Sequence, residues 1–333
     1  MAASAQFLLA YETGGADGKM HTHPSNAHEQ QWDTIDPTTD LSARSALFPA
    51  VAQAAKLLDT DSQLVQQLNA QLSQIPSLPQ AEKASASGKQ TVIAESYDPA
   101  AVAHNEENIG LEPVWPYNLI GDNSPMLALA KSTYATRPYP VHQDWSFDPV
   151  QATRLGLSDE VRSTLIALTE KYQKYINGFA NWGGPEGEFY VEQEGIVALA
   201  LAEALVQDYD GLIRIAPATP SQWDFEGSVW VRDRTRVDVQ VRGGVPTTVA
   251  IEAGATSTLR IRNPWPGQPV DVVDARGKTV LKSADSNLEV PVRKGQAYLL
   301  MRSNAGAAPL AFAPISGTPA LQLKRLGGVQ LGN

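Results

Sequence analysis

Residues 22–36, THPSNAHEQQWDTID, place one glutamate among histidines, amides and a tryptophan, with hardly an aliphatic side chain between them. Glu29 follows His28 and precedes Trp32. Such neighbours can raise the pKa of a carboxyl group, and a carboxyl that stays protonated near neutral pH can serve as a general acid. Glu29 is therefore the first candidate catalytic residue. The alternative is a surface glutamate in a solvated loop.

A second acidic stretch, residues 184–197 (GPEGEFYVEQEGIV), leads directly into an apolar run. Charge beside a buried element must be exposed, paired or functional. Glu192 lies near the start of the run without being inside it, so it is the second candidate catalytic carboxylate. The alternative interpretation is that Glu194 only interacts favourably with the positive end of the helix dipole.

Two further polar stretches, residues 104–123 and 139–148, mix aromatic rings with hydrogen-bonding side chains. This mixture is typical of sugar-binding sites, in which ring faces stack on sugars and polar groups bind hydroxyls. Isolated tryptophans, however, are also common in protein cores. The residues predicted to bind substrate are Trp32, His104, Asn105, Glu107, Glu112, Trp115, His142 and Gln193.

The composition excludes several other functions. The net charge of −10 over 333 residues argues against nucleic acid and anionic membranes as partners. The absence of cysteine excludes disulfides and thiolate metal sites. His21 and His23 offer two metal ligands without an obvious third, so no metal is predicted. We find no phosphate-binding loop and no nucleophile elbow, and we predict no cofactor.

The elements that must position these residues change in kind along the chain. Helical periodicity is strongest in residues 39–58, with Asp40 as the expected N-cap and Pro49 as a kink, and in residues 61–75, 124–137 and 158–176. The run 196–206 is apolar on all sides, which predicts a helix buried on all sides. Residues 80–90 have the composition of a flexible insertion.

After Pro217 the apolar period becomes two, which predicts seven or eight strands of an antiparallel β-sandwich. The predicted domains are therefore a helical portion at 1–217 with the candidate site, a β-sandwich at 218–303 and an irregular tail at 304–333. A buried helix among amphipathic ones fits part of an (α/α)6 toroid. A self-contained helical bundle fits the periodicity equally well.

Several segments resemble glycoside hydrolase family 95, the inverting α-L-fucosidases and α-L-galactosidases. Residues 203–223 (EALVQDYDGLIRIAPATPSQW) are similar to the passage from that family's last inner helix into its C-terminal sandwich, and residues 234–244 to the strand that follows. Residues 23–30 (HPSNAHEQ) resemble the loop that carries the general acid, which places Glu29 on that acid. Counting back from Asp210 places Glu192 on the family's water-activating aspartate.

The sequence also departs from the family pattern. Glu192 is one methylene longer than the aspartate it matches, and Gln193 stands where glycine is expected. Residues 104–118 are acidic where the family is basic. The family's front β-domain and first barrel helices have no counterpart here, which implies that a preceding segment or a second chain completes the site.

The resemblance implies a partial (α/α)6 toroid followed by a β-sandwich, and hydrolysis of a terminal glycosidic bond of an oligosaccharide or glycoconjugate with inversion. Glu29 would protonate the leaving oxygen and Glu192 would activate water. It also implies export to the periplasm or beyond, although residues 1–15 do not resemble a signal peptide. The alternatives are a non-catalytic carbohydrate-binding fragment, a phosphorylase, or a lyase using Tyr190 and His142.

Overall fold

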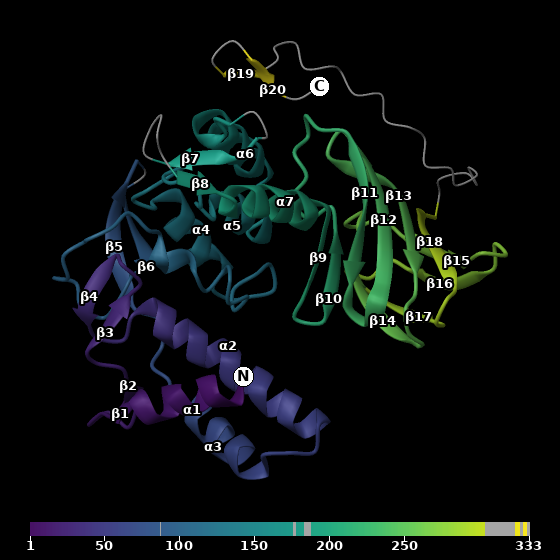
Figure 1. The fold of residues 1–333 in the computed structure, drawn as a ribbon. Coiled ribbons are helices and arrows are strands. Elements are labelled where there is room, and N and C mark those ends of the chain that lie inside the picture. Colours follow the sequence, from purple (N-terminus) through teal and green to yellow (C-terminus); the bar gives the residue numbers. More distant parts are fainter. Residues whose placement is uncertain (87, 176–177, 183–187, 304–323, 327–328, 332–333) are drawn as a thin grey trace. The chain divides into compact units, whose positions relative to one another are not determined.

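The computed structural model describes residues 1–86, 88–175, 178–182, 188–303, 324–326 and 329–331, and these form a mixed α+β protein (Figure 1). The chain divides into two compact units, Met1–Gln143 and Asp144–Asn333, which we call unit 1 and unit 2. The predicted mixture of helices and strands is confirmed. The division differs from the predicted boundary at residue 217.

Unit 1 combines short helices with three two-stranded antiparallel sheets, β1–β2, β3–β4 and β5–β6. Its helices are α1 (Ala2–Tyr11), α2 (Thr38–Leu57), α3 (Ser62–Leu72), the 3-10 helix η1 (Ile109–Leu111) and α4 (Leu127–Ala135). Its strands are β1 (Thr13–Gly14), β2 (Met20–His21), β3 (Ser25–Ala27), β4 (Gln31–Thr34), β5 (Gln80–Ser85) and β6 (Gly88–Ile93). A small core of Ala5, Phe48, Val51, Leu64 and Leu68 joins α1, α2 and α3.

The helices α2 and α3 confirm the two helices predicted first, and they pack against each other. Pro49 lies inside α2 without ending it. Asp40 is not the N-cap as predicted, because α2 begins earlier, after Pro37. Asp40 instead accepts a hydrogen bond from Ser25 Oγ at 2.7 Å, and it thereby links α2 to β3.

Residues 80–90 were wrongly predicted to be a flexible insertion. They belong to the hairpin β5–β6, in which Gln80 pairs with Ile93 and Ser85 with Gly88. The physical reason lies just beyond the low-complexity stretch, because Val92 and Ile93 are fully buried and fix one strand of the pair. The helix α1 was not predicted.

Unit 2 begins with three helices and a two-stranded sheet. These elements are α5 (Asp148–Arg154), α6 (Ser158–Tyr172), β7 (Ala180–Trp182), β8 (Glu188–Tyr190) and α7 (Glu192–Leu205). The helix predicted over residues 158–176 corresponds to α6, and its apolar stripe of Val161, Leu165, Leu168 and Tyr172 is buried. The helix α7 is not buried on all sides, because Leu201 on it is 41% exposed.

The rest of unit 2 is a β-sandwich whose two sheets share one hydrophobic core. The order is β11–β12–β13–β18–β15–β16 in the larger sheet and β17–β14–β10–β9 in the smaller. The strands are β9 (Val206–Tyr209), β10 (Leu212–Ile215), β11 (Phe225–Val231), β12 (Thr235–Arg242), β13 (Val245–Glu252), β14 (Ser257–Arg262), β15 (Val270–Asp274), β16 (Thr279–Ser283), β17 (Asn287–Val292) and β18 (Ala297–Arg302), with the 3-10 helix η2 (Arg232–Arg234) between β11 and β12.

Two details of the sandwich differ from the prediction. The strands β10 and β14 pair in parallel, so the sandwich is not wholly antiparallel. The sandwich also begins at Val206, before Pro217, because α7 runs directly into β9 and Leu205 is part of the sandwich core. The helices before it therefore belong to the same compact unit.

The predicted tail, 304–333, lies mostly outside the described residues. Its described parts, β19 (Lys324–Leu326) and β20 (Val329–Leu331), form an antiparallel pair. Within the described ranges, the helices of neither unit close into a barrel, so the toroid is not confirmed. None of the described helices combines the length and apolar character needed to cross a membrane.

A buried arginine fixes the segment that carries the candidate site in unit 1. Arg44, on α2, is fully buried, and its Nη1 donates a 2.8 Å hydrogen bond to the carbonyl of Met20. Its guanidinium lies 3.4 Å from a carboxylate oxygen of Glu12 and 3.6 Å from one of Asp36. Asp36 also accepts a 2.8 Å bond from the backbone N–H of Thr22. Residues 12–36 are thus attached to α2 at both ends.

Arg44→Ala will leave two carboxylates without their cation. Because burial already raises the pKa of Glu12 against the opposing effect of Arg44, we expect the free energy of unfolding to fall by about 3–5 kcal/mol. The control is Lys56→Ala at the exposed end of the same helix, which should cost less than about 1 kcal/mol. Equal losses in urea denaturation of the two variants would contradict the role given to Arg44.

Candidate functional site

The hairpin β3–β4 presents the predicted residues of the opening segment. Its turn holds His28 and Glu29, and Trp32 follows in β4. His28 and Asp33 both have positive φ, at 51° and 56°, which is uncommon for residues other than glycine. The irregular backbone is held by a 3.0 Å bond from the Asp33 N–H to Asn26 Oδ1. The polar residues of this turn are therefore positioned by a fixed backbone.

His28 contacts two of the glutamates predicted to bind substrate. Its Nε2 lies 2.7 Å from Glu112 Oε1, and its Nδ1 lies 3.9 Å from Glu107 Oε1. Thr39 Oγ1, on α2, donates a 2.6 Å bond to the other oxygen of Glu112. The hydrogen bond that His28 donates to Glu112 raises the pKa of His28, and burial opposes this effect. The buried Glu112 is thus held by one donor from the turn and one from α2.

Glu107 is the carboxyl of this cluster with the more unusual environment. Burial is the largest effect on it and raises its pKa, while the nearby His28 lowers it. The charges of Glu112 and Glu29 add to the increase, and the backbone N–H of Glu29 opposes it. A carboxyl that holds its proton to higher pH suits a general acid better than a fully solvated one does.

Glu29 itself is exposed. Asn105 Nδ2 donates a 2.9 Å hydrogen bond to Glu29 Oε2, and Gln143 Nε2 donates a 3.1 Å bond to Asn105 Oδ1. Next along the chain, Glu106 forms an ion pair with His142. Glu29 and Asn105, which are distant in sequence, are therefore joined directly by a hydrogen bond.

Trp32 stacks on His104, with ring centroids 4.0 Å apart and planes within 8° of each other. The backbone N–H of His104 donates to the carbonyl of Gln30 at 2.8 Å, which ties this residue to the turn. Trp32 remains 54% exposed. A flat aromatic face open to solvent beside hydrogen-bonding groups is the arrangement that sugar rings bind.

Unit 1 therefore brings together most of the predicted residues. The ones joined by the contacts above are Glu29, Trp32, His104, Asn105, Glu107, Glu112 and His142. Trp115 lies half-buried after η1. We call the residues around the turn, namely His28, Glu29, Trp32, His104, Asn105, Glu107 and Glu112, the turn cluster.

The remaining two predicted residues, Glu192 and Gln193, open α7 in unit 2. Glu192 is exposed. Gln193 is fully buried, and its Nε2 donates a 2.9 Å bond to the carbonyl of Leu168 on α6. This contact joins two helices, so nothing in the placement of Gln193 supports its predicted substrate-binding role. Because Glu29 and Glu192 belong to different units, their pairing stays a prediction.

Asp144 is a candidate that the sequence reasoning missed. It is fully buried, and burial is the main cause that raises its pKa to about 6. Its own backbone N–H and that of Trp145 oppose this effect, whereas the charges of Glu192 and Glu194 add to it. Trp145 packs against Tyr190 with ring centroids 5.3 Å apart. The neighbouring Trp145 was the only sequence signal, and it does not reveal the burial of Asp144.

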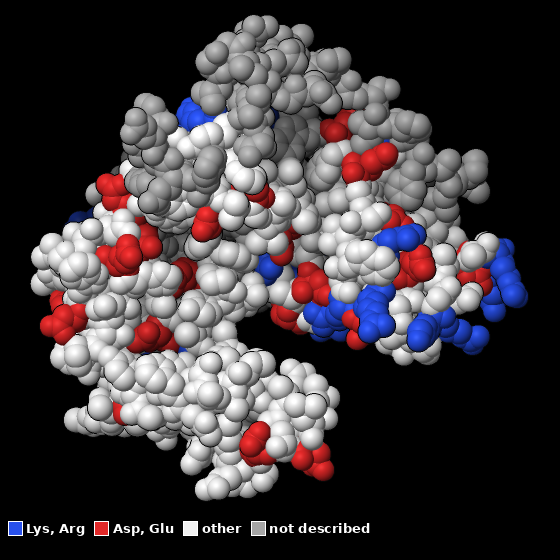
Figure 2. Space-filling view, viewed as in Figure 1, with Lys and Arg blue, Asp and Glu red and all other residues white. Residues whose placement is uncertain are grey.

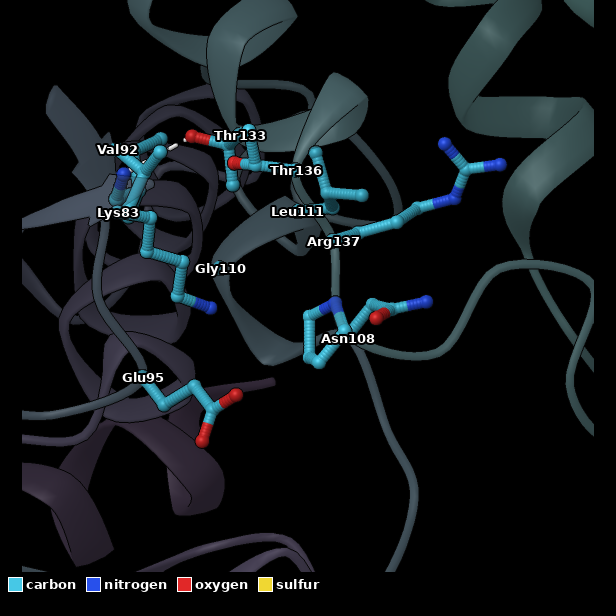
Figure 3. A pocket seen from close by; sticks show the side chains of 11 residues that line it. Lys83, Val92, Glu95, Asn108, Gly110, Leu111, Thr133, Thr136 and Arg137 are labelled. Carbon is cyan, nitrogen blue, oxygen red and sulfur yellow. Dashed lines mark hydrogen bonds between the residues drawn. The ribbon is translucent and has the colours of Figure 1, made fainter. Parts of the chain in front are cut away.

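A small cavity in unit 1 is lined by residues of β5–β6 and α4, and Lys83, Glu95 and Arg137 are among its lining residues (Figure 3). Its volume is about 10 Å³, which is room for one water molecule. Gly110 allows the close packing here, since a Cβ at this position would lie 2.5 Å from the carbonyl oxygen of Ile93. Burial raises the pKa of the nearby Glu95, with Lys83 and Gln30 opposing it.

In the part of the chain that the structure describes, no group of three or more His, Asp or Glu residues could hold a metal ion. No family model matches the chain, and no curated protein matches its sequence.

Asp144→Asn will change stability in a pH-dependent way. The ordinary pKa of an aspartate is 3.8, and in the fold it is about 6, so ionising Asp144 opposes folding as pH rises through this window. The substitution should raise the free energy of unfolding by up to about 3 kcal/mol at pH 8 and have little effect below about pH 4. Urea denaturation at both pH values measures this.

The control is Glu170→Gln on α6, an exposed carboxylate of the same unit. It should change stability little at either pH. A gain from Asp144→Asn that is the same at pH 4 and pH 8 would show that the charge of Asp144 is not its cause.

Proposed function

We propose that this chain is a glycoside hydrolase whose sugar-binding face is the turn cluster of unit 1. The observation that supports this most is the exposed Trp32–His104 plane next to the Glu29–Asn105 hydrogen bond. The aromatic face would stack on the apolar face of a sugar ring. The carboxylate and amide beside it would bind the hydroxyl groups that point outward from such a ring.

The finer proposal follows the resemblance to family 95, which is an inverting α-L-fucosidase or α-L-galactosidase built on part of an (α/α)6 toroid. In that reaction Glu29 donates a proton to the leaving oxygen as the glycosidic bond breaks. Glu192 takes a proton from the water that attacks the opposite face of the sugar. Inversion requires the two carboxyl groups to lie about 6.5–9.5 Å apart, which leaves room for that water.

Unit 1 also offers a second choice of acid. Glu107 has a pKa raised mainly by burial, whereas Glu29 is exposed and accepts a bond from Asn105. On these environments Glu107 suits the protonated role better, and Glu29 suits the binding of a sugar hydroxyl. The two assignments are separable by mutation.

A carbohydrate-binding role without catalysis is the second candidate. It is favoured by the fact that the exposed aromatic plane, the amide and several carboxylates all lie in unit 1, whereas the second catalytic carboxylate, Glu192, lies in unit 2. A phosphorylase would need a group of cations beside Glu29, whereas the charged neighbours in this region are glutamates and His28, whose ring is paired with Glu112. The lyase pair, Tyr190 and His142, is divided between the two units, as are Glu29 and Glu192, so this division does not choose between the two reactions.

Release of fucose or galactose tests the proposal. The purified chain should cleave a nitrophenyl α-L-fucoside or α-L-galactoside, and also the same sugar linked to lactose. Replacing the general acid by glutamine should lower kcat on the lactose-linked substrate by about 10²–10⁴-fold. The loss should be smaller on the nitrophenyl glycoside, because nitrophenolate leaves without full protonation.

The variants Glu29→Gln, Glu107→Gln and Glu192→Gln locate the acid and the base, and Glu82→Gln, an exposed glutamate on β5, is the matched control. The acid variant will show the difference between leaving groups, and the base variant will lose rate equally on both. Binding of the sugar without release by the unchanged chain would favour the non-catalytic candidate. If the chain neither binds nor releases the sugar, both the hydrolase and the non-catalytic candidate are refuted.

A further inference from the structure

A groove in unit 1 lies against the turn cluster and is not used by the proposed reaction. It has a volume of about 590 Å³ and is open to solvent, a size that fits small-molecule sites. Aromatic side chains line it from α1 and from β4, namely Phe7, Tyr11 and Trp32. Trp32 is also part of the turn cluster, so the groove continues from the proposed sugar-binding face.

The aromatic side chains of the groove are open to solvent. Phe7 and Tyr11 lie four residues apart on one face of α1, and their rings stack with centroids 5.7 Å apart and planes within 15°. Phe7 is 64% exposed. One face of Trp32 is occupied by His104, yet the ring is still half-exposed. The rings of Phe7 and Tyr11 are therefore available to a ligand in the groove, and the free face of Trp32 remains for the terminal sugar.

The walls of the groove are held in place by hydrogen bonds. Tyr11 donates its hydroxyl hydrogen to the carbonyl of Pro24, which attaches α1 to the segment that enters β3. Ser25 Oγ donates to Asp40 at 2.7 Å, which attaches β3 to α2. A groove with attached walls loses less conformational entropy on binding than a loose surface does.

The polar groups of the groove determine the kind of ligand. Asp33, Asp40 and Asn26 are among the residues that line it, and no Lys or Arg is among the described lining residues. On the face of unit 1 seen in Figure 2, carboxylates are spread over the surface and Lys and Arg are scarce. Carboxylates accept hydrogen bonds from hydroxyl groups and repel anions. An acidic ligand would therefore be rejected.

We propose that this groove, bordered by Phe7, Tyr11, Trp32, Asp33 and Asp40, is a second subsite that binds the neutral sugar units next to the terminal one. This inference rests on the proposed function, since it assumes that the terminal sugar lies at the turn cluster. It specifies the substrate class as neutral oligosaccharides longer than a disaccharide and excludes uronate-containing or sulfated ones.

The experiment compares Phe7→Ala with the unchanged chain. Phe7 is mostly exposed, so its removal should not prevent folding. Loss of one stacking ring should lower kcat/KM for the lactose-linked substrate about threefold to tenfold. Competitive inhibition by the free terminal monosaccharide should not change. The matched control is Leu57→Ala, which removes an 80% exposed apolar side chain of α2 that does not line the groove, and it should change neither value.

A second arm tests the charge selectivity. The same terminal sugar linked to a uronic-acid disaccharide should be a poorer substrate than the lactose-linked one at low salt, and the difference should shrink as salt rises. The groove assignment is overturned if Phe7→Ala changes inhibition by the monosaccharide and kcat/KM for the longer substrate alike, or if it changes neither. It is also overturned if Phe7→Ala changes the oligomeric state, since that result would make this face a contact between copies.

The outcomes separate the two proposals. If the chain accepts the monosaccharide but does not respond to ligand length or Phe7, the groove proposal fails and the proposed function stands. If the chain binds longer sugars without turnover, the same Phe7→Ala comparison is made on dissociation constants, and the groove proposal is decided there. If it binds neither the monosaccharide nor the longer sugars, both proposals fail.

Discussion

The buried charge of Arg44 is the interaction on which the candidate site depends. A guanidinium without access to water is costly unless it is paired, and here it has the carboxylates of Glu12 and Asp36 and the carbonyl of Met20. Those groups lie at the two ends of the segment from α1 to α2. The turn with His28 and Glu29 between them is consequently presented from a fixed base, as a binding residue needs to be.

The carboxyl groups of unit 1 lie in different environments, and this gives them different chemistry. Glu112 is buried and held by His28 and Thr39, Glu107 is partly buried with a raised pKa, and Glu29 is exposed beside Asn105. One region thus combines a group suited to hold a proton with groups suited to accept hydrogen bonds from hydroxyls. The exposed plane of Trp32 supplies the apolar surface beside them. Together these features favour a sugar as the ligand.

Local patterns predicted some elements well. The period-two segments after Pro217 form a sandwich, and the apolar stripe of α6 is buried. In both cases the spacing of apolar residues directly reflects which side chains face the core. The hairpin β5–β6 was missed, since its composition is polar and its stability comes from Val92 and Ile93 at one end. The exposure of Leu201 on α7 was likewise not predictable, because composition does not show which faces have neighbours.

The site was predictable only in part, for a related reason. Residue type and local clustering indicated Glu29, Trp32 and the stretch after His104, and the structure joins them through contacts across more than seventy positions, such as Asn105 with Glu29. The same reasoning predicted that Gln193 binds substrate, whereas its side chain donates a hydrogen bond to the backbone of α6. It also missed Asp144, whose pKa is raised by burial and by carboxylates on α7, a helix that is distant only in sequence.

Hydrogen–deuterium exchange of the chain with and without L-fucose or L-galactose tests the central claim most directly. If the sugar lies on the turn cluster, backbone exchange should slow in peptides covering residues 25–34 and 103–112, and peptides of the β-sandwich should not change. Sugar binding that leaves both of those segments unprotected, or that protects only unit 2, would contradict the account.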